Sequence, residues 1–176
     1  MARMFIALDI SNDDKKAIAN IQQQVLMPNA RVIPWQNFHL TLHFLGNIKP
    51  ETQLILTQKI NQFVAEIKPE RFSYCLTNIA LFRKPQVAYF GIDHDVPHLF
   101  SLEQQLGAIT SNLGFKSQHD GFTPHVSIFR KAKEIPRSSI NDRFEYLLSA
   151  TSFSLYQSTS TNNGEKYTAS HTWPLS

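Results

Sequence analysis

The sequence predicts an α+β protein made of two β-α-β-α-β units followed by one further strand. Hydrophobic patterns of strand period and helix period alternate along the whole chain. A His-x-Thr/Ser tetrapeptide opens the second strand of each unit, at 39–42 (HLTL) and 125–128 (HVSI). These observations divide the chain into pseudo-repeats of about 1–82 and 83–160, with a closing strand over 165–174.

Capping and breaking residues set the elements of the first unit. Ser11 is followed three residues later by Asp14, in the manner of a capping box, and Pro50 suits the first turn of a helix. In order, the expected elements are a strand over 3–10, a helix from Ser11 with Ile18, Ile21 and Val25 on its apolar face, a strand over 39–44, a helix from Pro50 that ends before Pro69, and a strand over 71–82.

The second unit contains the clearest helical periodicity of the chain. Leucines and an isoleucine recur at helical spacing after Pro97, and Gly114 stands where a helix would end. In order, the expected elements are a strand over 86–92, a helix with Leu99, Leu102, Leu106, Ile109 and Leu113 on one face, a strand over 125–130, a short helix over 136–144, a strand over 145–157, and a last strand over 166–173 after the turn signal at 162–164.

Composition limits the function classes. The 176 residues, 42% of them hydrophobic, suit a single folded domain over 1–176, and the net charge of +3 suits an anionic substrate. The one cysteine, Cys75, excludes an internal disulfide, which favours a reducing compartment. No segment is long and apolar enough to span a membrane. We therefore expect a cytoplasmic protein, with a monomer as the simplest state.

The motif spacing suits acid–base chemistry on a phosphodiester. Alternation along a strand puts His39 and Thr41 on one face, and likewise His125 and Ser127. One imidazole can take a proton while the other gives one, because the ordinary pKa of histidine lies near neutrality. The two hydroxyls can donate hydrogen bonds to the phosphate oxygens. If the duplicated units pack around a pseudo-twofold axis, the two motif strands face one another across a cleft.

Further candidates lie near the motifs. Arg130, at the end of the second motif strand, suits phosphate binding, whereas Lys131 and Lys133 are interpreted as a solvated basic loop. His39 and His43 have the spacing of a helical zinc site, but their strand pattern and the absence of a glutamate directly after His39 argue against a metal. We expect neither a metal nor a cofactor.

These residues resemble the 2H phosphoesterase superfamily, and within it the LigT-like RNA 2′,3′-cyclic phosphodiesterases, also called 2′-5′ RNA ligases. The similarity runs over nearly the whole chain. It includes the opening strand at 3–8 (RMFIAL), the two motifs in context at 38–46 (FHLTLHFLG) and 122–130 (FTPHVSIFR), and the C-terminal segments 155–158 (LYQS) and 164–167 (GEKY). The resemblance implies a bilobed fold in which two antiparallel sheets face a central cleft, with helices outside.

The resemblance also implies an activity. It is the metal-independent hydrolysis of RNA 2′,3′-cyclic phosphate ends to 2′-phosphate ends, with reversible, ATP-independent joining of RNA through 2′-5′ linkages. By analogy His39 is the proton donor and His125 the proton acceptor, with Thr41, Ser127 and Arg130 binding the phosphate. The partner would be RNA with a 2′,3′-cyclic phosphate or a 2′-5′ linkage, tRNA fragments among the candidates.

Two departures from the family pattern and one further residue bear on the cleft. Ser127 stands where this branch more often has threonine, and His43 stands where lysine is common. Because His43 is predicted on the same strand face as His39, we interpret it as lining the cleft without transferring a proton. Phe82, beside Arg83, is a candidate for stacking on a base.

Two alternatives stay open on the sequence. One is a 2H phosphodiesterase that acts on 2′-5′ oligonucleotides or on a small nucleotide cyclic phosphate. The other is a non-catalytic module that binds RNA ends. The presence of both histidines and both hydroxyls argues against the second, and the residues that would select the nucleotide lie on loops that the motifs do not define.

Overall fold

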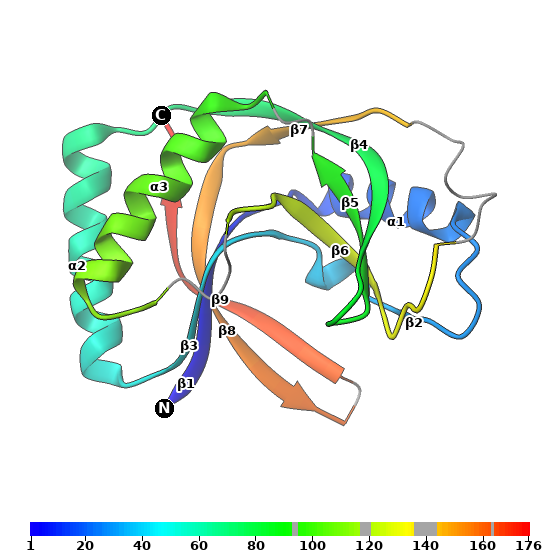
Figure 1. The fold of residues 1–176 in the computed structure, drawn as a ribbon. Coiled ribbons are helices and arrows are strands. Elements are labelled where there is room, and N and C mark those ends of the chain that lie inside the picture. The colour runs from blue at the N-terminus through cyan, green and yellow to red at the C-terminus, as the bar shows by residue number, and fades with distance from the viewer. Residues whose placement is uncertain (93–94, 117–120, 136–143, 163) are drawn as a thin grey trace.

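The computed structural model has an α+β fold, as predicted (Figure 1). It describes residues 1–92, 95–116, 121–135, 144–162 and 164–176. The elements are β1 Ala2–Leu8, α1 Asn12–Gln24, β2 Arg31–Val32, the 3-10 helix η1 Trp35–Asn37, β3 Leu40–Ile48, α2 Pro50–Ile67, β4 Phe72–Phe82, β5 Val87–Ile92, α3 Pro97–Asn112, β6 His125–Arg130, β7 Tyr146–Ala150, β8 Ser152–Thr161 and β9 Gly164–Pro174.

The strands form one curved antiparallel sheet with two halves. Its order is β7-β4-β5-β6-β3-β1-β8-β9, and β2 pairs with β6 in addition. The halves, β7-β4-β5-β6 and β3-β1-β8-β9, are joined where a single residue pair, Leu40 and Val126, links β3 to β6. Both of these side chains are fully buried. The junction of the two halves is therefore the place where the two motif strands meet.

Strand exchange interlocks the two predicted units. β4 belongs to the first unit but pairs with β5 and β7 of the second, whereas β8 of the second unit pairs with β1 of the first. The single strand expected over 145–157 is accordingly wrong, because the chain breaks at Thr151 into β7 and β8, which lie in opposite halves of the sheet. The helix expected over 136–144 lies outside the described residues, except for Phe144, which is not helical.

The helices begin and end at the predicted signals. The Ser11 hydroxyl oxygen accepts a hydrogen bond from the Asp14 backbone N–H at 3.1 Å, which caps α1. α2 and α3 each start with a proline in the first turn. Gly114 follows α3 with a φ of +83°, a conformation that favours glycine. No described helix is long and apolar enough to cross a membrane.

The helices cover the outer side of both halves of the sheet. α2 and α3 lie side by side on the half that contains β3 and β9, and α1 lies at the other end, near β5 and β6 (Figure 1). The α3 residues Leu99, Leu102 and Leu106 are buried, which confirms the apolar stripe predicted from the sequence. The core therefore occupies one side of the curved sheet and leaves the motif hydroxyls and imidazoles on the other.

Candidate active site

The pairing of the two motif strands brings the predicted residues together. Leu40 lies opposite Val126 in an antiparallel pair. In an antiparallel pair, the residue before Leu40 faces the residue after Val126, and the reverse. His39 is therefore across from Ser127, and Thr41 is across from His125. Each imidazole therefore has a hydroxyl on its own strand and a second one on the facing strand. The two motifs form one site.

Backbone carbonyls fix the orientation of both imidazoles. The Nδ1–H of His39 donates to the carbonyl oxygen of Asn37 at 2.7 Å, and the Nδ1–H of His125 donates to that of Thr123, also at 2.7 Å. A carbonyl can only accept, so each Nδ1 carries a proton. Nε2 is therefore the atom of each ring that can exchange a proton. That of His39 lies 2.9 Å from the Thr41 hydroxyl, which donates to it while the ring is neutral.

Aromatic rings surround the imidazole of His39. Its centroid lies 4.8 Å from that of Phe5 and 5.1 Å from that of Tyr167, which meets it edge-on. Tyr156 stacks on Phe5 at 5.3 Å and lies 6.2 Å from the imidazole of His39. This apolar surrounding removes water from the imidazole on one side and holds the ring plane in place.

Burial lowers the pKa of His39 to about 4. The hydrogen bond to the Asn37 carbonyl opposes this effect, whereas the nearby positive charges of His125, Lys15 and Arg130 add to it. In the free protein His39 is therefore neutral at neutral pH. A negative charge placed beside the ring would oppose the effect of these positive charges and raise the pKa of His39.

His125 has a matching aromatic support from the other half of the sheet. The Phe82 ring meets it edge-on at 4.9 Å, and the Tyr89 ring lies at 5.1 Å. These two rings stack on each other at 4.2 Å. The structure thus places Phe82 at the site, in contact with an imidazole. Its stacking on a base stays a prediction.

An extra residue follows the hydroxyl of each motif. β1 pairs Ala7 with Thr41 and then Ile6 with His43, so Leu42 is the additional residue in β3. In β6 the additional residue is Ile128, because Tyr89 pairs with Ser127 whereas Ala88 pairs with Phe129. Such a residue reverses the alternation of side chains beyond it. It decides which later residues share a face with the histidines.

The shift in β6 turns Arg130 toward the site. Five residues after His125, Arg130 would point to the opposite face in a regular strand. The shift restores it to the face of His125 and Ser127, and its positive charge acts on His39 across the junction. Arg130 is half-buried, and a guanidinium in this position suits contact with a phosphate beside the imidazoles.

The shift in β3 turns His43 away from the site. Its Nε2 donates to the backbone carbonyl of Glu103 in α3 at 2.8 Å and lies 3.4 Å from the carboxylate of the same residue. Gly107 makes room for the ring, since a Cβ there would lie 3.1 Å from its Cε1. The prediction that His43 shares a face with His39 is wrong, and its role is to join β3 to α3.

A buried glutamine holds the shift in β6. Gln22 on α1 donates from Nε2 to the carbonyl oxygen of Ile128 at 2.6 Å and to that of Ile33 at 3.1 Å. The backbone N–H of Ile33 also donates to the Ile128 carbonyl, at 2.9 Å. The carbonyl oxygen of the additional residue, Ile128, therefore accepts hydrogen bonds from Gln22 and Ile33.

The β8–β9 hairpin is hydrogen-bonded to Asn37, the residue whose carbonyl orients the His39 ring. The side-chain amide of Asn37, whose carbonyl accepts from His39, donates to the backbone carbonyl of Glu165 at 2.7 Å. The carboxylate of Glu165 accepts from the hydroxyls of Ser158 at 2.7 Å and Ser160 at 2.6 Å. These hydrogen bonds, then the charges of Arg3 and Arg130, lower the pKa of Glu165.

Sequence reasoning missed several residues that support the site. All but Tyr89 came from segments whose resemblance to the family was visible but whose side chains had no assigned role. These are Phe5 in the opening strand, Tyr89 in β5, and Tyr156, Glu165 and Tyr167 in the C-terminal segments. For the four aromatic residues, the signal that could have identified them was a ring in each of four predicted strands.

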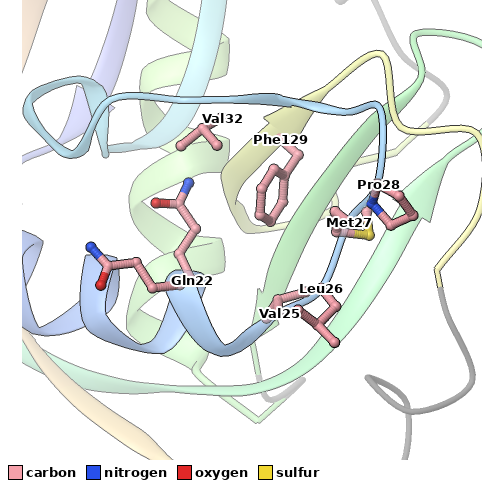
Figure 2. A pocket seen from close by; sticks show the side chains of 8 residues that line it. Gln22, Val25, Leu26, Met27, Pro28, Val32 and Phe129 are labelled. Carbon is pink, nitrogen blue, oxygen red and sulfur yellow. The ribbon is translucent and has the colours of Figure 1, made fainter.

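A groove lies on the other face of β6. It encloses about 560 Å³ between the end of α1 and β2. The Phe129 ring points into it beside Gln22 and Val32 (Figure 2). Phe129 faces away from the imidazoles because of the same shift that brings Arg130 to them, so this groove is separate from the candidate site. Within the described ranges no three His, Cys, Asp or Glu side chains gather in a way that would hold a metal.

Comparison with solved structures confirms the fold. The apo form of E. coli LigT matches with a TM-score of 0.84 at 24% identity, covering 99% of this chain and 97% of that one. A structure from Thermus thermophilus matches with a TM-score of 0.81 at 22% identity, covering 98% and 97%. At these identities the likeness concerns the architecture alone.

Relatives and a family model give the same result at the level of sequence. A Methanocaldococcus jannaschii protein named RNA 2′,3′-cyclic phosphodiesterase is 28% identical over 97% of this chain and 99% of its own. The protein of the same name from Escherichia coli K12 is 25% identical over 98% and 96%. The sequence model of the family described as the 2′-5′ RNA ligase superfamily matches residues 11–157 of this chain. The resemblance carried by the two motif strands is therefore confirmed, and the chain belongs to the 2′-5′ RNA ligase superfamily.

Proposed function

We propose that this protein hydrolyses RNA 2′,3′-cyclic phosphate ends to 2′-phosphate ends. The observation that carries the proposal is the pair of imidazoles on facing strands, each with Nδ1 bound to a backbone carbonyl, so that Nε2 is the atom for proton transfer. Membership of the superfamily and the names of the relatives support the same reaction. The enzyme would act on RNA ends, such as those of tRNA fragments, as a cytoplasmic monomer.

We assign the two proton transfers to the Nε2 atoms, and the division of roles between them follows the analogy with the family. His125 takes a proton from water, and the resulting hydroxide attacks the phosphorus. The bond from phosphorus to the 3′ oxygen breaks, and His39 gives its Nε2 proton to that oxygen. The products are a 2′-phosphate and a 3′-hydroxyl. His39 ends neutral and His125 protonated, and exchange with solvent restores both.

The hydroxyl of Thr41 links the charge of His39 to phosphate binding. While His39 is neutral, this hydroxyl donates to Nε2 at 2.9 Å. Once Nε2 carries a proton, the hydroxyl hydrogen is free to turn toward a non-bridging phosphate oxygen. Ser127 would donate a second hydrogen bond, and the Arg130 guanidinium would offset the negative charge. The low pKa of His39 means that its proton arrives together with the anionic substrate.

Ligation would use the same transfers with a different nucleophile. A 5′-hydroxyl of RNA in place of water yields a 2′-5′ linkage, with His125 again the base and His39 again the acid. Cleavage of that linkage exchanges the two roles. No nucleotide triphosphate is consumed, because the cyclic phosphate already holds the phosphoryl group that is transferred.

The first test is an assay of the purified protein on an oligoribonucleotide that ends in a 2′,3′-cyclic phosphate, in the presence of EDTA. We expect a 2′-phosphate product and a severe loss of activity in His39→Ala and His125→Ala. His98→Ala, an exposed histidine of α3, is the matched control and should retain activity. A 3′-phosphate product, or full activity in either motif variant, would refute the mechanism.

The second test assigns the acid. A substrate with sulfur in place of the 3′ bridging oxygen releases a thiolate, which needs little protonation. We expect His39→Ala to recover much of its lost rate on this substrate, whereas His125→Ala should not. Recovery by His125→Ala instead would exchange the roles. Activity on cyclic mononucleotides but not on RNA would favour the small-nucleotide alternative, and binding without turnover would favour the non-catalytic module.

A further inference from the structure

Basic side chains from three separate segments gather at one end of the sheet. They lie where β6 ends, in the turn between β4 and β5, and on the short strand β2. We call this set the basic rim, and it consists of Arg31, Arg83, Lys84, Lys131 and Lys133.

Strand pairing shows that the three segments are neighbours. Arg130, the last residue of β6, pairs with Arg31 on one side and with Val87 on the other. Just beyond β6, the backbone N–H of Ala132 donates to the carbonyl of Gln86 in the β4–β5 turn at 3.0 Å. Figure 1 shows the β4–β5 turn, β2 and the end of β6 close together at the tip of the half of the sheet formed by β7, β4, β5 and β6.

All five rim side chains are exposed, and among the described residues no carboxylate forms a salt bridge with them. Glu134 is the acidic residue on the same segment, and it is exposed as well. Glu165, across the cleft, is already bound by two serine hydroxyls. Within the described part of the chain the rim is therefore a surface with an excess of positive charge, five basic side chains against Glu134.

The rim continues directly from the candidate active site. Arg83 follows Phe82, whose ring contacts His125. Lys131 follows Arg130, which shares a face with His125 because of the shift in β6. A strand whose terminal phosphate lies between the imidazoles would meet these cations with its next phosphates. Lysine and arginine that contact successive phosphates supply most of the affinity in sequence-independent binding of single strands.

We infer that the basic rim binds the phosphates of the RNA strand on the 5′ side of the cyclic end, so that the substrate is an oligonucleotide rather than a cyclic mononucleotide. This inference rests on the proposed function of the site. The rim residues lie beyond the imidazoles, so they should change the binding of RNA without changing the chemical step.

The test removes charge from the β4–β5 turn in the double variant Arg83→Ser/Lys84→Ser. The matched control is Lys49→Ser/Lys59→Ser, which removes the same charge from exposed positions at and within α2, on the other side of the molecule (Figure 1). Each protein is assayed on a cyclic mononucleotide and on an octanucleotide with the same 3′ end. Binding of a labelled octanucleotide that ends in a 2′-phosphate is measured by anisotropy over a range of salt.

We expect the rim variant to keep the kcat/KM of the wild type on the mononucleotide and to lose affinity for the octanucleotide. Two lost phosphate contacts should reduce the slope of log affinity against log salt by about 1.4, since each contact to a single strand contributes about 0.7. The control should retain the slope of the wild type.

An unchanged slope in the rim variant, or an equal loss of slope in the control variant, would overturn the inference. The anisotropy measurement decides this even if neither substrate is hydrolysed. Absence of hydrolysis would contradict the proposed function separately.

Discussion

The low pKa of His39 makes a prediction about stability as well as catalysis. In the unfolded chain His39 takes up a proton near its ordinary pKa of 6.5, whereas in the folded protein it does so only at about 4. Between these two values the unfolded chain binds more protons at this position than the folded protein does. The free energy of unfolding should therefore fall as the pH falls from 6.5 to 4, and His39 should add no further loss below that.

The magnitude follows from the pKa difference. One pKa unit corresponds to about 1.4 kcal/mol, so a fall from 6.5 to about 4 removes about 3 kcal/mol of stability on acidification. That is a large part of the stability of a typical domain, which is about 5–15 kcal/mol. Carboxylates also titrate in this range, so the contribution of His39 has to be isolated with a variant.

The assay is urea unfolding of the wild type and of His39→Asn at pH 7.5, 5.5 and 4.5. The stability difference between the two proteins should shift in favour of the variant as the pH falls, because asparagine cannot be protonated. The Cε1–H resonance of His39, assigned by its absence from the spectrum of the variant, should titrate near pH 4. Addition of inorganic phosphate should raise this pKa. A midpoint between pH 6 and 7 in the free protein, or a stability difference that does not depend on pH, would refute the reasoning.

Three further variants test other parts of the site. Thr41→Val removes a hydroxyl donor but keeps the shape, so kcat should fall about a hundredfold on a cyclic-phosphate RNA end while the fold is retained. Gln22→Leu leaves the extra carbonyl of β6 without its side-chain donor, which should cost about 1–3 kcal/mol in urea unfolding and lower the kcat/KM through a displaced Arg130. His43→Gln should retain the wild-type kcat within about twofold and reduce thermal stability, because His43 binds α3 and not the substrate.

Each of these expectations has a contrary result. A wild-type kcat in Thr41→Val would show that the Thr41 hydroxyl does not contribute to the reaction. Wild-type stability and activity in Gln22→Leu would mean that the shift in β6 does not depend on the glutamine. A large loss of kcat with unchanged stability in His43→Gln would mean that His43 acts on the substrate and does not serve mainly to join β3 to α3.

Local patterns were sufficient for much of the fold. Helix starts at Ser11, Pro50 and Pro97 depend on contacts within a few residues, so the sequence displays them directly. The strand character of both motifs was likewise visible, because alternation at His39 and at His125 is a local property. The division of 145–157 into two strands was not visible, since each part of this segment carries a strand pattern and only their different partners separate them.

By itself, the sequence determined which residues carry the chemistry: two imidazoles, each two positions before a hydroxyl on the same strand face. The tertiary structure decided which neighbours join them. A single extra residue after Ser127 brings Arg130 to the site, and one after Thr41 removes His43 from it. The physical reason is that side chains alternate with a period of two, so one unpaired residue reverses every later position. Whether a residue is unpaired depends on partners far away in the chain, which no local pattern records.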